Sequence, residues 1–204
     1  MTTKRIWLAG AKGAGKSELL KALEGYNLGQ QNKGLDHPYL IPNQLKDKIA
    51  KDEPIDRLAD YRTEIGLVLD RVHEQEYLDH GIFESSLLDS VAYAATRMSY
   101  IINDGTGNAD QLARWELVLH VSARMLRDSE LPDAVIFVPG HAEEDFYEKL
   151  EEAVTAAVWE FLPDEVQKFK LVETEVLQRV EETATILDKL NEPSDTTAES
   201  NGED

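Results

Sequence analysis

The sequence predicts an α/β fold of three layers, in which a mostly parallel, five-stranded sheet lies between helices. Short β-favouring runs alternate along the chain with longer segments whose apolar residues recur at helical spacing. Residues 134–138 (AVIFV) are continuously apolar, as expected for a strand covered on both faces of a parallel sheet. A glycine-rich segment, residues 10–17, separates the first run from the first helical segment. This order of elements favours a doubly wound sheet with right-handed crossovers.

The first 77 residues supply two of the expected strands and two helices. Residues 4–9 form the first strand, and residues 17–23 (SELLKAL) begin a helix after the glycines. Residues 25–34, rich in Gly, Asn and Gln, are expected to form a loop. Residues 37–42 give the weakest strand signal, and residues 55–77 a long amphipathic helix.

The middle of the chain predicts a strand and two further helices. Residues 81–83 form a short apolar run that ends in Glu84, and a helix follows from residue 86 to 98. Residues 112–125 carry a broad apolar face, so we expect this helix to be largely buried, with Trp115 in the core.

The last elements continue the alternation. The strand at 134–138 closes at Pro139-Gly140, and residues 146–161 follow with helical spacing. A final strand is expected over 169–172 and a final helix over 176–187. Ligands bind at the carboxyl ends of strands in such folds, so the glycine-rich loop, the end of the 81–83 strand and the Pro139-Gly140 turn are expected to converge.

Composition limits both the architecture and the chemistry. Residues 191–204 (NEPSDTTAESNGED) have no large apolar side chain, which predicts a disordered acidic tail after one domain over 1–190. The absence of cysteine excludes disulfides and thiolate metal sites, and the five histidines show no zinc spacing. The net charge of −19 argues against nonspecific binding to nucleic acid. Without an apolar run near 18 residues or a leader, we expect no membrane partner and a cytoplasmic protein, in the host cytoplasm if the source is viral.

The glycine-rich segment fits the phosphate-binding P-loop pattern G-x-x-x-x-G-K-[ST]. Its glycines let consecutive backbone N–H groups point into one concavity that holds the phosphates of a nucleoside triphosphate. Lys16 adds a positive charge, and the hydroxyl of Ser17 is a ligand for the accompanying Mg²⁺. We therefore predict a three-layer P-loop NTPase fold that binds ATP and Mg²⁺, with Lys16 as a catalytic group. The residues expected to bind the cofactor are Gly10, Ala11, Lys12, Gly13, Ala14, Gly15, Lys16 and Ser17.

Together with this loop, residues 81–93 (GIFESSLLDSVAY) resemble the P-loop nucleoside and nucleotide kinases, most of all phage-encoded thymidylate-kinase-like proteins. In that family an Asp/Glu-Arg-Ser segment ends the third strand. Its acid lies near the acceptor hydroxyl or the magnesium, and its arginine holds phosphate. Glu84 and Ser86 match this segment, whereas Ser85 replaces the arginine. The resemblance implies that Glu84 is a catalytic or metal-binding acid; the alternative is an ordinary helix cap.

These kinases also carry arginines in a lid after the strand that corresponds to 134–138, but residues 139–163 contain none. The loss of both arginines should slow phosphoryl transfer greatly unless others replace them. The arginines available for this role are Arg57, Arg62, Arg97, Arg124 and Arg127.

Four residues outside the loop are candidate contacts to a phosphate or an acceptor: Arg62, Ser86, Asp89 and Arg97. Asp89 lies about one helical turn beyond Glu84, so it either faces the site or pairs with a cation on the surface. Each of the two arginines either contacts a phosphate or is a solvated residue of an amphipathic helix.

The function predicted on this basis is ATP-dependent phosphoryl transfer to a nucleoside, a nucleotide or a modified nucleotide. One alternative is a phage-type kinase that acts on a hydroxymethylated pyrimidine in DNA, which would make DNA a substrate. The other is a nucleotide-binding regulatory module with little or no turnover. The sequence leaves the acceptor and the oligomeric state open, a homo-oligomer included.

Overall fold

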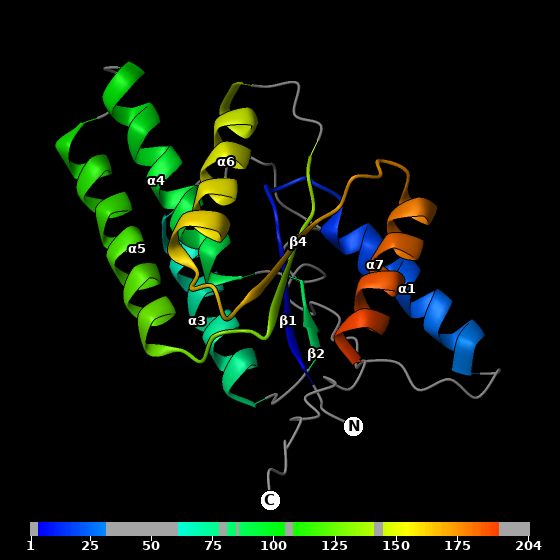
Figure 1. The fold of residues 1–204 in the computed structure, drawn as a ribbon. Helices are drawn as coiled ribbons and strands as arrows, with labels where there is room; N and C mark the ends of the chain where they lie inside the picture. Colours follow the sequence, from blue (N-terminus) through cyan, green and yellow to red (C-terminus); the bar gives the residue numbers. More distant parts are fainter. Residues whose placement is uncertain are drawn as a thin grey trace, which may run out of the picture.

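The computed structural model describes residues 4–31, 61–77, 81–84, 86–104, 108–140 and 145–191. Within these residues the chain forms a parallel sheet of four strands between layers of helices (Figure 1). The predicted α/β class is therefore confirmed. The structure describes four strands rather than five, and the strand expected at 37–42 lies outside the described residues.

The strands lie in the order β2-β1-β3-β4, so the first strand occupies the interior of the sheet. β1 (Arg5–Ala9) pairs with β2 (Gly81–Phe83) on one side and with β3 (Ala134–Phe137) on the other. β4 (Gln167–Lys170) pairs with β3 at the edge of the described sheet. All pairs are parallel, so the loops that follow the strands emerge at one edge.

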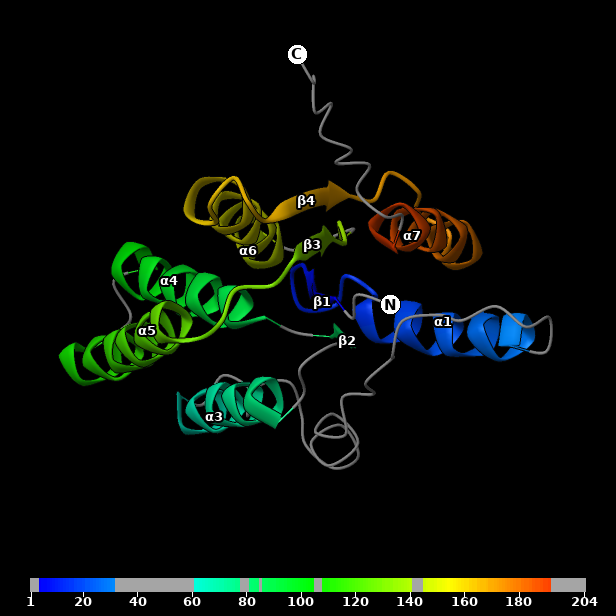
Figure 2. The same ribbon diagram turned by 60° about the horizontal axis from the view of Figure 1, so that its bottom comes forward.

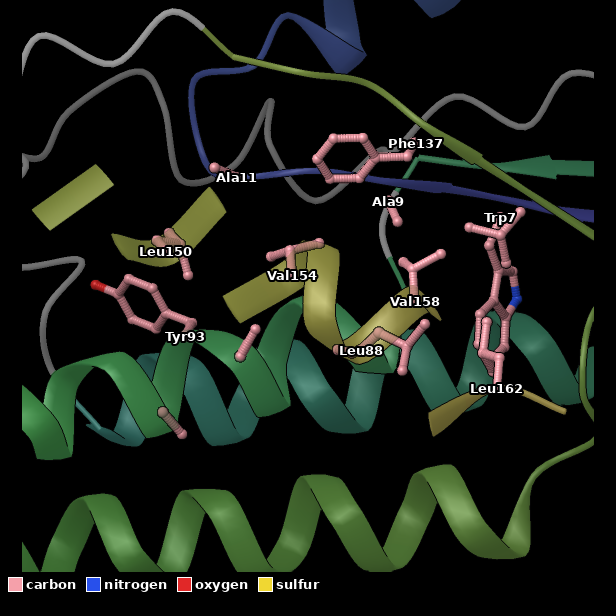
Figure 3. Close-up of a cluster of buried hydrophobic side chains, with 14 of the residues drawn as sticks. Trp7, Ala9, Ala11, Leu88, Tyr93, Phe137, Leu150, Val154, Val158 and Leu162 are labelled. Carbon is pink, nitrogen blue, oxygen red and sulfur yellow. The ribbon is translucent and has the colours of Figure 1, made fainter. Parts of the chain in front are cut away.

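Alternate strand residues divide the interior into two apolar clusters because successive side chains point to opposite faces of a sheet. Ile6 and Leu8 of β1 point toward α1 (Lys16–Gln31) and α7 (Val176–Asn191). Trp7 and Ala9 point into the larger cluster, together with Phe137, Leu150 and Val158 (Figure 3).

The larger cluster is covered by two tiers of helices (Figure 2). The inner tier consists of α4 (Leu87–Asp104), α6 (Asp145–Ala156) and the short π-helix η2 (Ala157–Phe161). The outer tier consists of α3 (Tyr61–Tyr77) and α5 (Ala109–Asp128). Among the helices that the structure describes, none is long and apolar enough to cross a lipid bilayer.

Trp115 of α5 is buried, as predicted, but the expectation that α5 is largely buried is wrong. Its buried residues are Trp115, Val118 and Ser122, whereas Leu117 is 50% exposed. α5 packs on α4 and α3 rather than on the sheet, so most of its residues stay exposed or half-buried.

Several predicted boundaries also differ from the structure; α4, for example, continues to Asp104 instead of ending at 98. α1 continues to Gln31 through the expected loop, where Tyr26 still packs against the apolar cluster. The helix expected over 146–161 widens into η2 for its last turn. β4 begins two residues earlier than predicted because this half-exposed strand has no clear apolar pattern. Asn191 belongs to α7, and the rest of the predicted tail lies outside the described residues.

Candidate functional site

The P-loop connects the carboxyl end of β1 to the first turn of α1, as the motif requires. Gly13 and Gly15 have φ values of 88° and 87°, a left-handed conformation that side chains with a Cβ rarely adopt. A Cβ on Gly10 would collide with the carbonyl oxygen of Val138, which directly follows β3. Glycine is therefore required at these three positions for the curvature of the loop and for its close approach to β3.

The side chain of Lys16 is buried inside the loop. Its Nζ donates hydrogen bonds to the carbonyl oxygens of Gly10 and Ala11, the latter at 3.1 Å. It also lies 3.3 Å from a carboxylate oxygen of Asp89. The ammonium group is therefore held at the loop, where a bound phosphate would meet it.

Ser17 and Glu84 lie side by side, although 67 residues separate them in the sequence. The hydroxyl of Ser17, in the first turn of α1, donates a hydrogen bond to Oε1 of Glu84, which directly follows β2. The residue Glu84 is buried. A hydroxyl and a carboxylate in contact, next to a phosphate-binding loop, are a donor set that suits Mg²⁺. Among the described residues, no group of three or more His, Cys, Asp or Glu forms a further metal site.

Asp89, which the sequence left between a site role and a surface role, points into the site. Its Oδ1 accepts a hydrogen bond from the backbone N–H of Gly10 at 3.2 Å. The side chain of Ser86 caps the start of α4, since its Oγ accepts from the Asp89 N–H at 3.3 Å and donates to Oδ1 at 3.3 Å. Ser86 thus orients Asp89 toward the loop, and Ser85 lies outside the described residues.

Arg97 lies about two turns beyond Asp89 on α4, against aromatic rings. Its guanidinium lies 4.4 Å from the ring centroid of Phe146 and donates to the hydroxyl of Tyr93 at 2.9 and 3.1 Å. The Nζ of Lys12 in the P-loop lies 5.9 Å from the centroid of the same Tyr93 ring. Burial raises the pKa of the Tyr93 phenol, so the hydroxyl remains protonated at neutral pH. Arg97 and the P-loop therefore share Tyr93 as a neighbour.

The other predicted arginines are placed less closely to the loop. Arg62 is exposed near the start of α3, with its guanidinium 5.6 Å from the ring centroid of Tyr61. Arg124 and Arg127 pair with Asp128 at the end of α5, which leads to the amino end of β3, opposite the P-loop edge. The hydrogen bond from Arg124 lowers the pKa of Asp128. Arg57 lies outside the described residues.

Sequence reasoning missed Arg179, which lies in the first turns of α7 and is only 6% exposed. Together with Gly13, Gly15, Pro139 and Thr174 it lines a cavity of about 180 Å³ beside the P-loop. The pattern of α7 contained a signal, because Arg179 precedes buried residues at helical spacing (Thr183, Ile186 and Leu190). A cation on the buried face of a helix indicates a specific partner.

The turn at Pro139-Gly140 also meets the loop, as predicted. A Cβ on Gly140 would lie 3.6 Å from Ala14, and the Gly140 N–H donates to Glu151 at 2.8 Å. Segments that follow β1, β2 and β3 thus come together at one edge of the sheet.

Comparison with known proteins supports the fold assignment. No protein-family model and no curated protein sequence matches the chain. Among solved structures, the chain is similar to a deoxyadenosine kinase from M. mycoides, determined with the products dCMP and a flexible dCDP bound. The two structures align with a TM-score of 0.59 and 16% sequence identity, over 91% of this chain and 99% of the kinase. The chain therefore has the P-loop fold that this nucleoside kinase adopts.

Proposed function

We propose that the protein is a P-loop kinase that transfers the γ-phosphoryl group of ATP to a nucleoside or nucleotide. The observation that carries the proposal is the contact between Ser17 and Glu84 beside the P-loop, with Lys16 and Asp89 paired at 3.3 Å in the same place. An isolated loop would account for nucleotide binding alone. Two acids that reach it from the next strand and helix add the groups that phosphoryl transfer needs.

The donor nucleotide would bind with its phosphates in the concavity of the P-loop. The N–H groups of the loop and the Lys16 ammonium would neutralise the phosphate charge. Ser17 and Glu84 would hold Mg²⁺, which would supply positive charge to offset that of the phosphates. The nucleobase of ATP would lie in the neighbouring cavity of about 180 Å³, because Gly13 and Gly15 of the P-loop form part of its lining.

The acceptor would approach from the side of α4. Asp89 is the second acid at the loop, and either it or Glu84 would accept the proton of the attacking hydroxyl. If Glu84 binds the metal, Asp89 is the other acid available as the base, since its carboxylate lies at the loop beside Lys16 and the Gly10 N–H.

Arg97 is our candidate to replace the missing lid arginine. It contacts Phe146, near the start of α6, the element that follows the position at which related kinases carry their lid. It also shares Tyr93 with Lys12 of the P-loop. In this role, the guanidinium would leave the rings and turn toward a phosphate at the loop.

A second candidate function is nucleotide binding with little turnover. The specific observation in its favour is that residues 139–163 contain no arginine and that Ser85 stands where related kinases have one. Under this reading, Arg97 keeps its aromatic contacts after the nucleotide binds, and phosphoryl transfer stays slow.

The test is transfer of labelled γ-phosphate from ATP, with Mg²⁺, to deoxynucleosides, their monophosphates, and DNA with normal or hydroxymethylated pyrimidines. We expect label in one class of free nucleoside or nucleotide. Label in the polymer alone would favour the DNA-directed kinase. Tight ATP binding without a labelled acceptor would contradict the kinase proposal and favour the binding module.

A further inference from the structure

We infer that Arg179 is a positioning residue that fixes the P-loop in its phosphate-binding conformation. Only the expected change in KM for ATP rests on the proposed kinase function. The guanidinium donates to three backbone carbonyls on three separate segments. Nη1 donates to Ala14 in the P-loop at 2.9 Å, Nη2 to Pro139 after β3 at 2.7 Å, and Nε to Glu173 after β4 at 2.8 Å. One side chain thus ties together three loops at the edge of the sheet.

The bond to Ala14 has a direct consequence for the phosphate-binding amides. The carbonyl of Ala14 and the N–H of Gly15 belong to one trans peptide unit, in which the two groups point in opposite directions. By holding the carbonyl, Arg179 turns the Gly15 N–H away from α7. The left-handed φ of 87° at Gly15 is the conformation that this orientation uses.

Arg179 also contributes charge. Within the part of the chain that the structure describes, its guanidinium forms hydrogen bonds to carbonyl oxygens and no ion pair with a carboxylate. A buried cation is costly unless an opposite charge is near, and carbonyl dipoles compensate it only in part. A polyphosphate in the loop would supply the missing negative charge, in a chain that otherwise carries a net charge of −19.

α7 holds the loop after β4 by a second contact as well. The carboxylate of Glu182, one turn beyond Arg179, accepts hydrogen bonds from the backbone N–H groups of Val172 and Glu173 at 3.0 to 3.2 Å. Since α7 is anchored to the sheet by Val180 and Leu187, the guanidinium is held on a rigid element. This rigidity is what lets one side chain set the geometry of the P-loop.

The experiment compares Arg179→Met, which keeps the length and loses the charge and donors, with Arg179→Lys, which keeps the charge. Lys189→Met is the matched control, because it removes one exposed cation from the last turn of the same helix. Calorimetric titration gives the Kd of each variant for Mg-ATP and for inorganic tripolyphosphate. Amide spectra of ¹⁵N-labelled protein report whether Gly13 and Gly15 respond to tripolyphosphate.

We expect Arg179→Met to raise both Kd values about ten- to hundredfold and to remove the glycine amide response. Arg179→Lys should recover part of the affinity, and Lys189→Met should stay within about twofold of the wild type. In kinetic assays the KM for ATP should rise while the KM for the acceptor stays constant, a split that general destabilisation would not produce.

The inference would be overturned if a folded Arg179→Met protein bound tripolyphosphate as tightly as the wild type does. Equal rises in the KM values for ATP and for the acceptor would also overturn it. If Arg179→Met does not fold, the test depends on Arg179→Lys, which keeps the charge and lacks the planar guanidinium group. Wild-type affinity of this variant for tripolyphosphate would also overturn the inference. A wild type that binds Mg-ATP without transferring phosphate would contradict the proposed kinase and leave this test intact. A wild type that binds no phosphate would overturn both.

Discussion

In the kinase that we propose, the side of the site assigned to the donor and the side assigned to the acceptor are built from different interactions. On the donor side, Lys16 and Arg179 donate hydrogen bonds to backbone carbonyls of the loops that surround them. On the proposed acceptor side, the guanidinium group of Arg97 lies over the ring of Phe146, 4.4 Å from its centroid, and donates to the hydroxyl of Tyr93. Cations are thus fixed at the loop in the first region and stacked on side chains in the second.

This difference indicates how each region would work. A guanidinium or ammonium group bound to backbone is already in place when a phosphate arrives, so the donor side is preorganised. A guanidinium stacked on a ring must exchange one partner for another before it contacts a ligand. We therefore expect substitutions on the donor side to reduce binding and transfer most, and substitutions on the acceptor side to act mainly on the rate.

The largest effect is expected for Lys16→Ala. The substitution removes the buried ammonium that lies beside the loop carbonyls and Asp89, and with it a charge that would stabilise the transferring phosphoryl group. We expect a loss of about 10²- to 10³-fold or more in kcat/KM for ATP. Lys21→Ala on the same helix is the control, because Lys21 is exposed. Equal activity of the two variants would remove the basis for a preorganised donor side.

Glu84→Gln tests whether the negative charge of Glu84, rather than the size of its side chain, is needed for Mg²⁺ binding. The amide keeps the size of the side chain and can still contact the Ser17 hydroxyl, but it loses the negative charge. We expect about a hundredfold lower kcat and a higher Mg²⁺ requirement, measured by titrating Mg²⁺ at fixed ATP. Asp89→Asn is the companion variant. If Asp89 is the base, the kcat of Asp89→Asn should fall while its Mg²⁺ requirement stays unchanged. If instead Asp89→Asn raises the Mg²⁺ requirement and Glu84→Gln does not, Asp89 is the metal ligand and Glu84 the base.

The residues around the P-loop were also the ones for which the sequence carried the most direct signal. A P-loop is contiguous, so residues 10–17 were identified from their spacing, whereas Glu84 was singled out by the resemblance to P-loop kinases. The fold class followed from the apolar run at 134–138 and the alternation of strands and helices. Each of these signals is local in sequence.

Arg179 and the pairing of Asp89 with Lys16 were harder to predict because they depend on contacts across the chain. Arg179 lies 165 residues from Ala14, and nothing local distinguishes it from a surface arginine except its place on the buried face of α7. The burial of α5 was overestimated for a related reason, since periodicity reveals an apolar face without revealing what covers it.

Gly10→Ala tests the close approach of the P-loop to β3. A Cβ there would collide with the Val138 carbonyl, which is backbone and cannot move aside cheaply. We expect the free energy of unfolding to fall by about 1 to 3 kcal/mol, measured by denaturant titration. Gly66→Ala on α3 is the matched variant, since a Cβ there meets nothing within 4 Å, and it should stabilise by about 0.5 to 1 kcal/mol. A Gly10→Ala protein as stable as the Gly66→Ala protein would mean that the loop tolerates a shift away from β3.

The smallest effect is expected for Arg97→Gln, which tests whether the acceptor-side cation reaches the phosphate. We expect kcat to fall about tenfold while the Kd for ATP stays within twofold, because Arg97 would act during transfer rather than during donor binding. Arg124→Gln is the control, since Arg124 is exposed and lies at the opposite edge of the sheet.

Tyr93→Phe sharpens the same test because it removes the hydroxyl that accepts two hydrogen bonds from Arg97 while keeping the ring. If the guanidinium must leave Tyr93 to reach the phosphate, loss of this hydroxyl lowers the cost of leaving, and kcat should hold or rise slightly. A fall in kcat as large as that of Arg97→Gln would instead mean that Arg97 acts from its position on Tyr93. In that case the acceptor side would be as preorganised as the donor side, and the contrast between the two regions would not hold.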